Sequence, residues 1–147
     1  MSSKRAVLAG LAGTVAMTAL WLLEPRIGLA RLAFGDILSS LLAVATAYAS
    51  LGPVVGWIFH LCVGVVLALV YAASVVWRLG GPPVVRGMLF GLGIFVLAQV
   101  VFMPLVGAGV FSRGDPAMLF GSLVGHLAYG GVLGAFYGGA GASTPVS

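Results

Sequence analysis

The stretch that decides the fold of this chain is "HLCVGVVLALVY", residues 60–71, which places one histidine at the start of a continuous apolar run. No Asp, Glu, Lys or Arg occurs between residues 37 and 77. About 20 apolar residues are enough for a helix to cross a bilayer. Because lipid offers no hydrogen bonds to the backbone, and the run lacks the alternation of a barrel strand, it predicts a transmembrane helix.

The whole chain has the composition of an integral membrane protein. Of its 147 residues, 61% are hydrophobic and 7% are charged, which predicts a single all-α transmembrane domain over residues 1–147. Seven Lys and Arg against three acids are too dispersed for a nucleic-acid patch, so the lipid bilayer is the expected partner. The single cysteine, Cys62, excludes an internal disulfide and a CxxC metal site.

Four spans are expected, at residues 6–23, 53–76, 84–106 and 116–137. Asp115 is placed to cap the last one, with Pro116 at its first helical position. Residues 37–50 are too few to cross, so they predict a short interfacial or re-entrant helix capped by Asp36. The tail at residues 139–147 is expected to be flexible.

The charges indicate an orientation. One side of the membrane receives basic residues without an acid, namely Lys4, Arg5, Arg78 and Arg86. The other side receives both signs, namely Arg26, Arg31, Arg113, Glu24, Asp36 and Asp115. The positive-inside rule then predicts that both termini are cytoplasmic, an N-in/C-in topology. Trp21, Tyr71 and Tyr137 lie near span ends, where aromatic side chains commonly serve as interfacial anchors.

The phrase that opens at His60 has a second copy. "HLAYGGVLGAFY", residues 126–137, matches "HLCVGVVLALVY" in six of twelve positions, and "RAVLAGLA" (5–12) matches "RGMLFGLG" (86–93). These matches predict two tandem repeats of two helices each, at about residues 5–77 and 86–138. Because each repeat crosses twice, the halves have the same orientation and form a four-helix bundle with a pseudo-twofold axis along the membrane normal.

The repeat pairs the only two histidines of the chain. The pattern H-x3-G-x6-Y puts its members on one helix face, as His60, Gly64 and Tyr71 in one copy and His126, Gly130 and Tyr137 in the other. Glycine-rich faces let transmembrane helices approach closely. The pseudo-twofold axis predicts that the two imidazoles lie at equal depth.

Three interpretations of this pair remain open. In the first, both histidines are neutral packing residues, hydrogen-bonded within the bundle. In the second, His60 and His126 are the axial ligands of a b-type haem, with Gly64 and Gly130 leaving room for the macrocycle. In the third, the histidines belong to a proton or metal path, with His60 and His126 as the metal ligands.

Four polar side chains are the candidate partners of the histidines. Glu24 stands at the end of the first span and Gln99 lies within the third. Tyr71 and Tyr137 follow their histidines on the same helix faces. No nucleophile elbow, P-loop or HExxH motif occurs. We therefore expect a non-catalytic protein, an accessory or structural subunit that associates with itself or with other membrane subunits.

Three apolar segments also carry a family resemblance: "GWIFHLCVGVVLALVYA" (56–72), "RGMLFGLGIFVLAQVVFMPLVGAGVF" (86–111) and "GSLVGHLAYGGVLGAFYG" (121–138). In these segments the chain resembles a family of small four-helix bacterial and archaeal membrane proteins of unknown function. The resemblance implies a four-span fold in a prokaryotic inner membrane. It implies no activity, substrate or cofactor.

Overall fold

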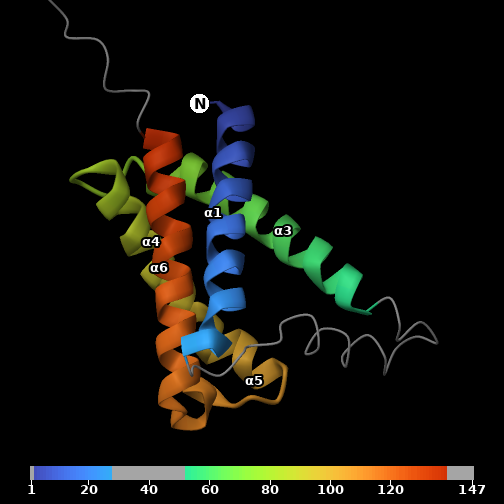
Figure 1. Cartoon of the computed structure of the whole chain (residues 1–147). Coiled ribbons are helices and arrows are strands. Elements are labelled where there is room, and N and C mark those ends of the chain that lie inside the picture. Colours follow the sequence, from blue (N-terminus) through green and yellow to red (C-terminus); the bar gives the residue numbers. More distant parts are fainter. Residues whose placement is uncertain (1, 28–51, 139–147) are drawn as a thin grey trace, which may run out of the picture.

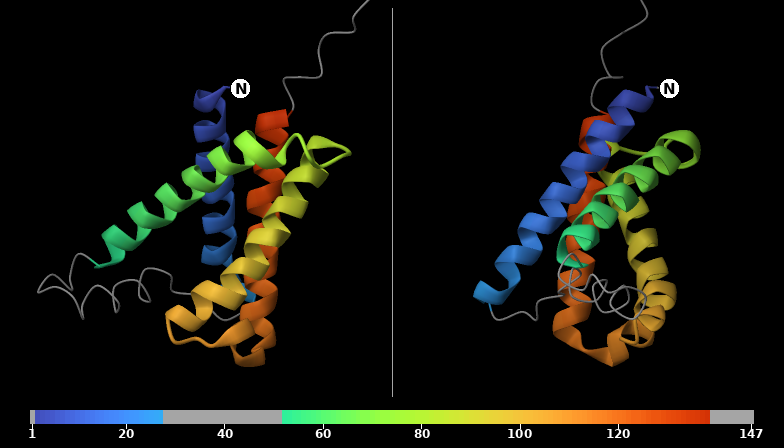
Figure 2. Two further views of the ribbon diagram at one scale, coloured as in Figure 1. Left: turned by 180° about the vertical axis from the view of Figure 1, so that it is seen from behind. Right: turned by 90° about the vertical axis from the view of Figure 1, so that its right-hand side faces the viewer.

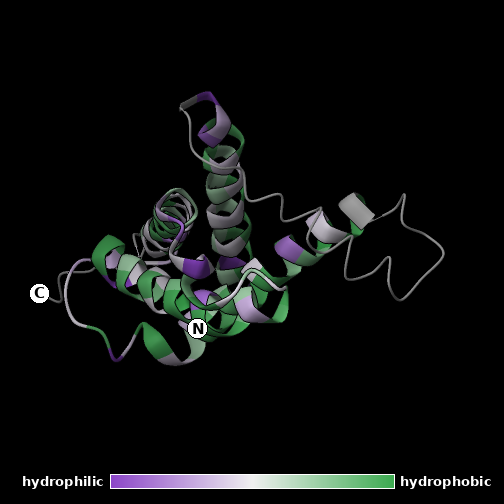
Figure 3. Ribbon diagram, turned by 90° about the horizontal axis from the view of Figure 1, so that it is seen from below, coloured by the Kyte–Doolittle hydropathy of each residue, from purple (hydrophilic) through white to green (hydrophobic). Residues whose placement is uncertain are grey.

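The computed structural model describes residues 2–27 and 52–138, and within these ranges the chain is helical with no strand. Four of its helical stretches are long and apolar enough to cross a membrane (Figure 3). The prediction of an all-α protein with four spans is therefore confirmed. The predicted short helix at residues 37–50, its cap Asp36 and the predicted flexible tail lie outside the described residues.

The elements follow one another as α1 (Ser3–Leu23), a 3-10 turn η1 (Glu24–Ile27), α3 (Gly52–Val70), a π-helical turn η3 (Tyr71–Val75), α4 (Pro83–Leu97), a second π-helical turn η4 (Ala98–Phe102), α5 (Met103–Leu105), a short turn η5 (Val110–Gly114) and α6 (Pro116–Gly138). Joined end to end, they form the spans Ser3–Arg26, Val54–Val75, Pro83–Leu105 and Pro116–Gly138. Asp115 caps α6 as predicted, because its Oδ1 accepts the backbone N–H groups of Ala117 and Met118.

Helix α6 forms the centre of the bundle. It packs against α1 on one side and α4 on the other, while α3 packs against α1 (Figure 1). The helices α3 and α4 leave their shared turn in diverging directions, so α3 leans away from α4 (Figure 2). The side of the bundle between α3 and α4 is consequently the least closely packed.

Glycines permit the closest helix crossings. A methyl group built at Gly87 of α4 would overlap the carbonyl oxygen of Gly130 in α6, and one built at Gly134 would overlap the carbonyl oxygen of Pro83. Between α1 and α3, a methyl group at Gly64 would overlap the hydroxyl of Thr14. The prediction that small residues bring these helices together is confirmed.

Two arginines donate hydrogen bonds to carbonyl oxygens near the C-terminal ends of neighbouring spans. Arg5 Nε of α1 donates to the carbonyl oxygen of Phe136 near the end of α6, at 2.8 Å. Arg86 Nη1 of α4 donates to the carbonyl oxygen of Val76 after η3, at 3.0 Å. Cations at helix C-termini satisfy carbonyls that have no partner within the helix. Each arginine thus binds the second helix of the other predicted repeat; the repeat and its pseudo-twofold axis stay predictions.

The expectation of interfacial anchors is wrong for two aromatic residues. Tyr71 is fully buried, and its ring meets that of Tyr137 edge-on at 6.1 Å and that of Phe90 at 5.2 Å. Trp21 is also buried. The indole of Trp21 lies against Gly125 of α6, where a methyl group would come within 2.6 Å of its Nε1. A position near the end of a span does not reveal in the sequence which way a ring turns.

Candidate functional site

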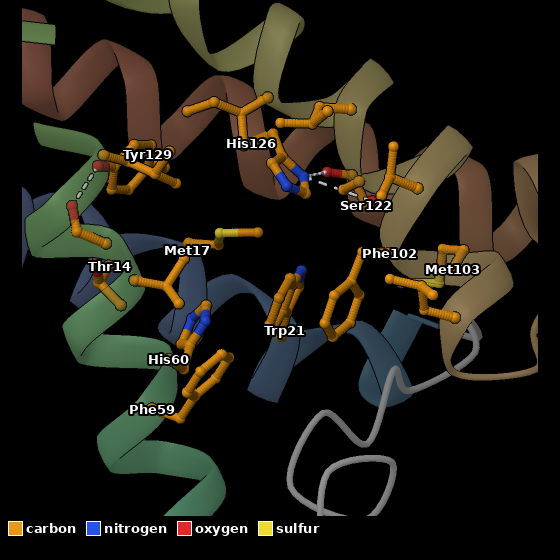
Figure 4. A pocket seen from close by; sticks show the side chains of 18 residues that line it. Thr14, Met17, Trp21, Phe59, His60, Phe102, Met103, Ser122, His126 and Tyr129 are labelled. Atoms are coloured by element: carbon orange, nitrogen blue, oxygen red, sulfur yellow. Dashed lines mark hydrogen bonds between the residues drawn. The ribbon is translucent and has the colours of Figure 1, made fainter. Parts of the chain in front are cut away.

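One cavity of about 320 Å³ contains both histidines. Its walls come from α1, α3, α6 and the span formed by α4, η4 and α5, and their side chains are mostly apolar (Figure 4). The polar side chains on its lining are Thr14, His60, Ser122, His126 and Tyr129. A volume near 300 Å³ is at the lower end for small-molecule sites. The cavity therefore has room for a compact ligand.

His60 forms part of the α3 wall. Its imidazole stacks on the indole of Trp21, with the ring centroids 5.2 Å apart and the planes 25° apart. The indole of Trp57 meets it edge-on at 6.1 Å. Trp21 is a site residue that sequence reasoning assigned to the membrane interface instead. Its spacing from Thr14 and Met17, which places all three on one face of α1, was the signal available.

His126 faces the cavity from α6, and its protonated nitrogen can be assigned from its partner. Its Nδ1 lies 2.7 Å from the carbonyl oxygen of Ser122, one turn earlier in the same helix. A carbonyl oxygen only accepts hydrogen bonds, so Nδ1 carries the proton of the neutral ring and donates it. The lone pair is consequently on Nε2. The ring of Phe95 lies edge-on at 6.0 Å.

A buried chain of hydrogen bonds leads to this histidine from the loop before α6. Ser112 Oγ donates to Gln99 Oε1 at 2.9 Å, and Gln99 Nε2 donates to Ser122 Oγ at 3.1 Å. Ser122 Oγ in turn lies 3.4 Å from His126 Nδ1. Gln99 was predicted to be a polar partner of a histidine, and the structure connects it to His126 through Ser122, a residue that the sequence analysis did not single out.

The two ends of this chain of bonds have unusual backbone geometry. Gln99 lies in the π-helical turn η4, which precedes Pro104, a residue without an N–H to donate. Ser112 has a φ of 49° and shares the left-handed region with Phe111 and Arg113. Non-glycine residues adopt that region at a cost of about 1 to 3 kcal/mol, and only where the surroundings hold them there. The bond to Gln99 is one such restraint on Ser112.

Three other predicted partners, Glu24, Tyr71 and Tyr137, do not line the cavity. Glu24 is buried, with its carboxylate against α6: a methyl group at Gly121 would lie 2.7 Å from Glu24 Oε1. Within residues 2–27 and 52–138, Glu24 forms no ion pair, and it does not line the cavity. Tyr71 and Tyr137 also lie outside the lining. Among the described residues, hydrogen bonds connect the predicted partner Gln99 to His126 through Ser122.

The residues around the histidines suit a haem poorly. The hydroxyl of Thr14 fills the space beside Gly64, and the backbone of Gly87 fills the space beside Gly130, so neither glycine leaves room for a macrocycle. The side chain of Met17 lies between the two imidazoles in Figure 4. For a metal ion, the described ranges hold no group of three or more His, Cys, Asp or Glu side chains. The cavity is better suited to a molecule smaller than haem.

Comparison with known proteins places the chain in a family. A protein-family model described as "Family of unknown function (DUF6789)" matches residues 2–145. The chain belongs to this family. The resemblance to a family of unknown function is thus confirmed over nearly the whole chain. No curated protein and no solved structure matches it. For this DUF6789 protein, the cavity with its two histidines is the feature from which a function can be argued.

Proposed function

We propose that this protein is a non-catalytic integral membrane subunit that holds a lipophilic molecule in the cavity of His60 and His126. The observation that carries the proposal is the convergence of the two histidines, from different helices, on one cavity with otherwise apolar walls. Sites of this kind combine apolar lining with a few polar groups that orient the ligand. Ionisable side chains are costly within a membrane, which favours a functional role for the pair.

The opening of the cavity supports a ligand that arrives from the bilayer. Phe59 of α3, Leu97 of α4 and Val101 of η4 line the cavity and are also exposed on the surface of the bundle. The helices α3 and α4, to which Phe59 and Leu97 belong, diverge from one another (Figure 2). In a spanning helix such exposed apolar side chains face lipid, so the entrance is accessible from the hydrocarbon region rather than from water.

We expect replacement of Ala98 by phenylalanine to close the cavity. Ala98 lines it from η4, and a larger side chain there would occupy the space of a ligand. In nanodiscs, Ala98→Phe should lower saturable binding of a photoreactive alkyl probe by about tenfold or more, a change of about 1.4 kcal/mol or more. The measurement is probe incorporation by mass spectrometry of the peptides that line the cavity.

Val100→Phe is the matched control, because Val100 lies in the same π-helical turn, is exposed and does not line the cavity. It should bind the probe as the unmodified protein does. Equal binding by both variants, or no saturable binding by the unmodified protein, would contradict the proposal. The absorption spectrum of the same preparation tests the haem alternative: a Soret band lost in His60→Ala and His126→Ala would replace our proposal with the haem one.

The subunit role and the orientation are further parts of the proposal. Large apolar side chains are exposed along α3 and α4, including Val54, Ile58 and Leu89. They suit contact with lipid or with another membrane protein. We propose an N-in/C-in topology in a prokaryotic inner membrane, supported by the basic residues at the end of the bundle where α1 begins.

Crosslinking in native membranes tests the subunit role. We expect a short amine-reactive crosslinker, acting on Lys4 or the N-terminus, to give a product larger than the single chain, either a heteromer or a homomer. Mass spectrometry of that product identifies its components. Recovery of only the free chain over the range of crosslinker concentrations would contradict the subunit role, whereas it would leave ligand binding by the cavity unaffected.

Proton translocation is a second candidate. The observation that favours it is the buried Glu24 carboxylate, together with the buried hydrogen bonds that link Ser112, Gln99 and Ser122. Buried ionisable and polar groups within spans are typical of ion paths. Proton flux into liposomes that is lost in Glu24→Gln would support this candidate. Flux equal to that of empty liposomes would exclude it.

A further inference from the structure

Two of the three hydroxyl groups on the cavity wall, those of Thr14 and Tyr129, have already used their only protons. Thr14 Oγ1 donates to the carbonyl oxygen of Gly10 at 2.8 Å. Tyr129 donates its phenolic proton to the carbonyl oxygen of Gly64 at 2.6 Å. A hydroxyl has one proton and two lone pairs, so toward the cavity these two groups can only accept hydrogen bonds. The wall formed by Thr14 and Tyr129 therefore favours a ligand group that donates a hydrogen bond.

His126 also offers the cavity a hydrogen-bond acceptor. Its Nδ1 proton is directed to the carbonyl oxygen of Ser122, so the lone pair on Nε2 is the remaining hydrogen-bonding group of the ring. No described residue donates a hydrogen bond to Nε2. The side chain is 9% exposed and lines the cavity. An acceptor that faces an apolar cavity is poorly solvated, so a ligand that supplies the donor gains affinity.

We propose that the cavity recognises a lipophilic molecule through a hydroxyl group that donates a hydrogen bond to Nε2 of His126. This inference rests on the proposed function and specifies the class of its ligand. The apolar body of the ligand would lie against Met17, Leu97 and Val101, with the hydroxyl at the His126 end. Long-chain alcohols and quinols share this chemistry. Hydrocarbons and ethers lack the proton that the site requires.

Ser122 and Gln99 act as positioning residues in this arrangement. The Ser122 carbonyl directs the proton of His126 to Nδ1, and Gln99 holds the Ser122 side chain through its amide. A hydrogen bond from the other ring nitrogen is the usual means by which proteins select the tautomer of a histidine. The hydrogen bond within α6 therefore fixes the tautomer in which Nε2 is the acceptor before any ligand binds.

The test compares two probes that differ by one proton donor. A medium-chain diazirine alcohol and its methyl ether are each titrated into the full-length protein in nanodiscs, and cavity labelling is measured by mass spectrometry. The alcohol should bind about tenfold more tightly than the ether, the ratio that corresponds to about 1.4 kcal/mol. In His126→Phe, which keeps an aromatic ring but has no acceptor, the two probes should bind equally.

Nitrogen NMR of the ring supplies a readout that does not depend on labelling. In the unmodified protein, His126 should carry its proton on Nδ1, and the Nε2 signal should shift when the alcohol is added but not when the ether is added. Equal binding of both probes to the unmodified protein, or a proton on Nε2, would overturn this inference and leave lipophile binding intact. Failure of both probes to label the cavity would overturn the proposed function as well.

Discussion

Gly87→Ala is expected to force α4 away from α6 and to destabilise the protein more than any other single change considered for this chain. A methyl group at this position would overlap the carbonyl oxygen of Gly130 and would lie 2.7 Å from the backbone nitrogen of Gly134. Both obstacles are main-chain atoms of a continuous helix, so neither can move aside as a flexible side chain would. Overpacking of this kind costs about 1 to 3 kcal/mol, and more where the backbone must shift.

The effect is measured as the loss of unfolding free energy in detergent micelles, followed by circular dichroism during denaturation. Gly93→Ala is the matched control, because Gly93 lies in the same helix and a methyl group there meets no atom within 4 Å. The control should be neutral or slightly stabilising, since alanine favours the helix by up to about 1 kcal/mol over glycine. If the two variants were equally stable, the close crossing of α4 and α6 would be refuted.

Gln99→Leu should have the second largest effect, because Gln99 is fully buried and both ends of its amide are bonded. Leucine would leave the hydroxyls of Ser112 and Ser122 without these partners. A buried polar group left unpaired costs about 1 to 3 kcal/mol, although hydrogen bonds between transmembrane helices average about 0.6 kcal/mol. We expect a total loss of about 1 to 3 kcal/mol in the same denaturation experiment.

A double-mutant cycle with Ser112→Ala separates the hydrogen bond from the change in volume. If Ser112 and Gln99 are coupled as the structure indicates, the effects of the two variants should fall short of additivity by about 0.5 kcal/mol or more. Backbone hydrogen exchange over Gly109–Gly114 should also rise in Gln99→Leu, because the left-handed residues around Ser112 lose a restraint. Strict additivity, with unchanged exchange, would refute this role of Gln99.

Most of the fold was predictable from the sequence because crossing a bilayer imposes a simple requirement on length and hydropathy. The predicted third span, residues 84–106, corresponds to Pro83–Leu105, and Asp115 caps the last helix as expected. The prediction did not contain the π-helical turns η3 and η4, since these depend on local hydrogen-bond geometry. The predicted four-helix bundle also did not specify that α3 diverges from α4.

The candidate site was predictable only in part. The repeated phrase identified His60 and His126, and the structure places both on one cavity. The partner assignments were less successful: Glu24 and Tyr71, chosen because they are polar and near a span, lie away from the cavity. Trp21 was assigned to the interface, although its ring stacks on His60. Polarity identifies a candidate side chain, but it does not say which neighbour that side chain faces.

By itself, the sequence determined that the chain forms four membrane-crossing helices and that two of them carry a histidine one turn before a glycine, because span length and helical periodicity are local properties. Only the tertiary structure decided what surrounds those residues. The neighbouring helices fill the space beside Gly64 and Gly130, and the carbonyl oxygen of Ser122 accepts a hydrogen bond from Nδ1–H of His126. Contacts between helices depend on how each is rotated and tilted against the others, and that is set by the packing of all four together.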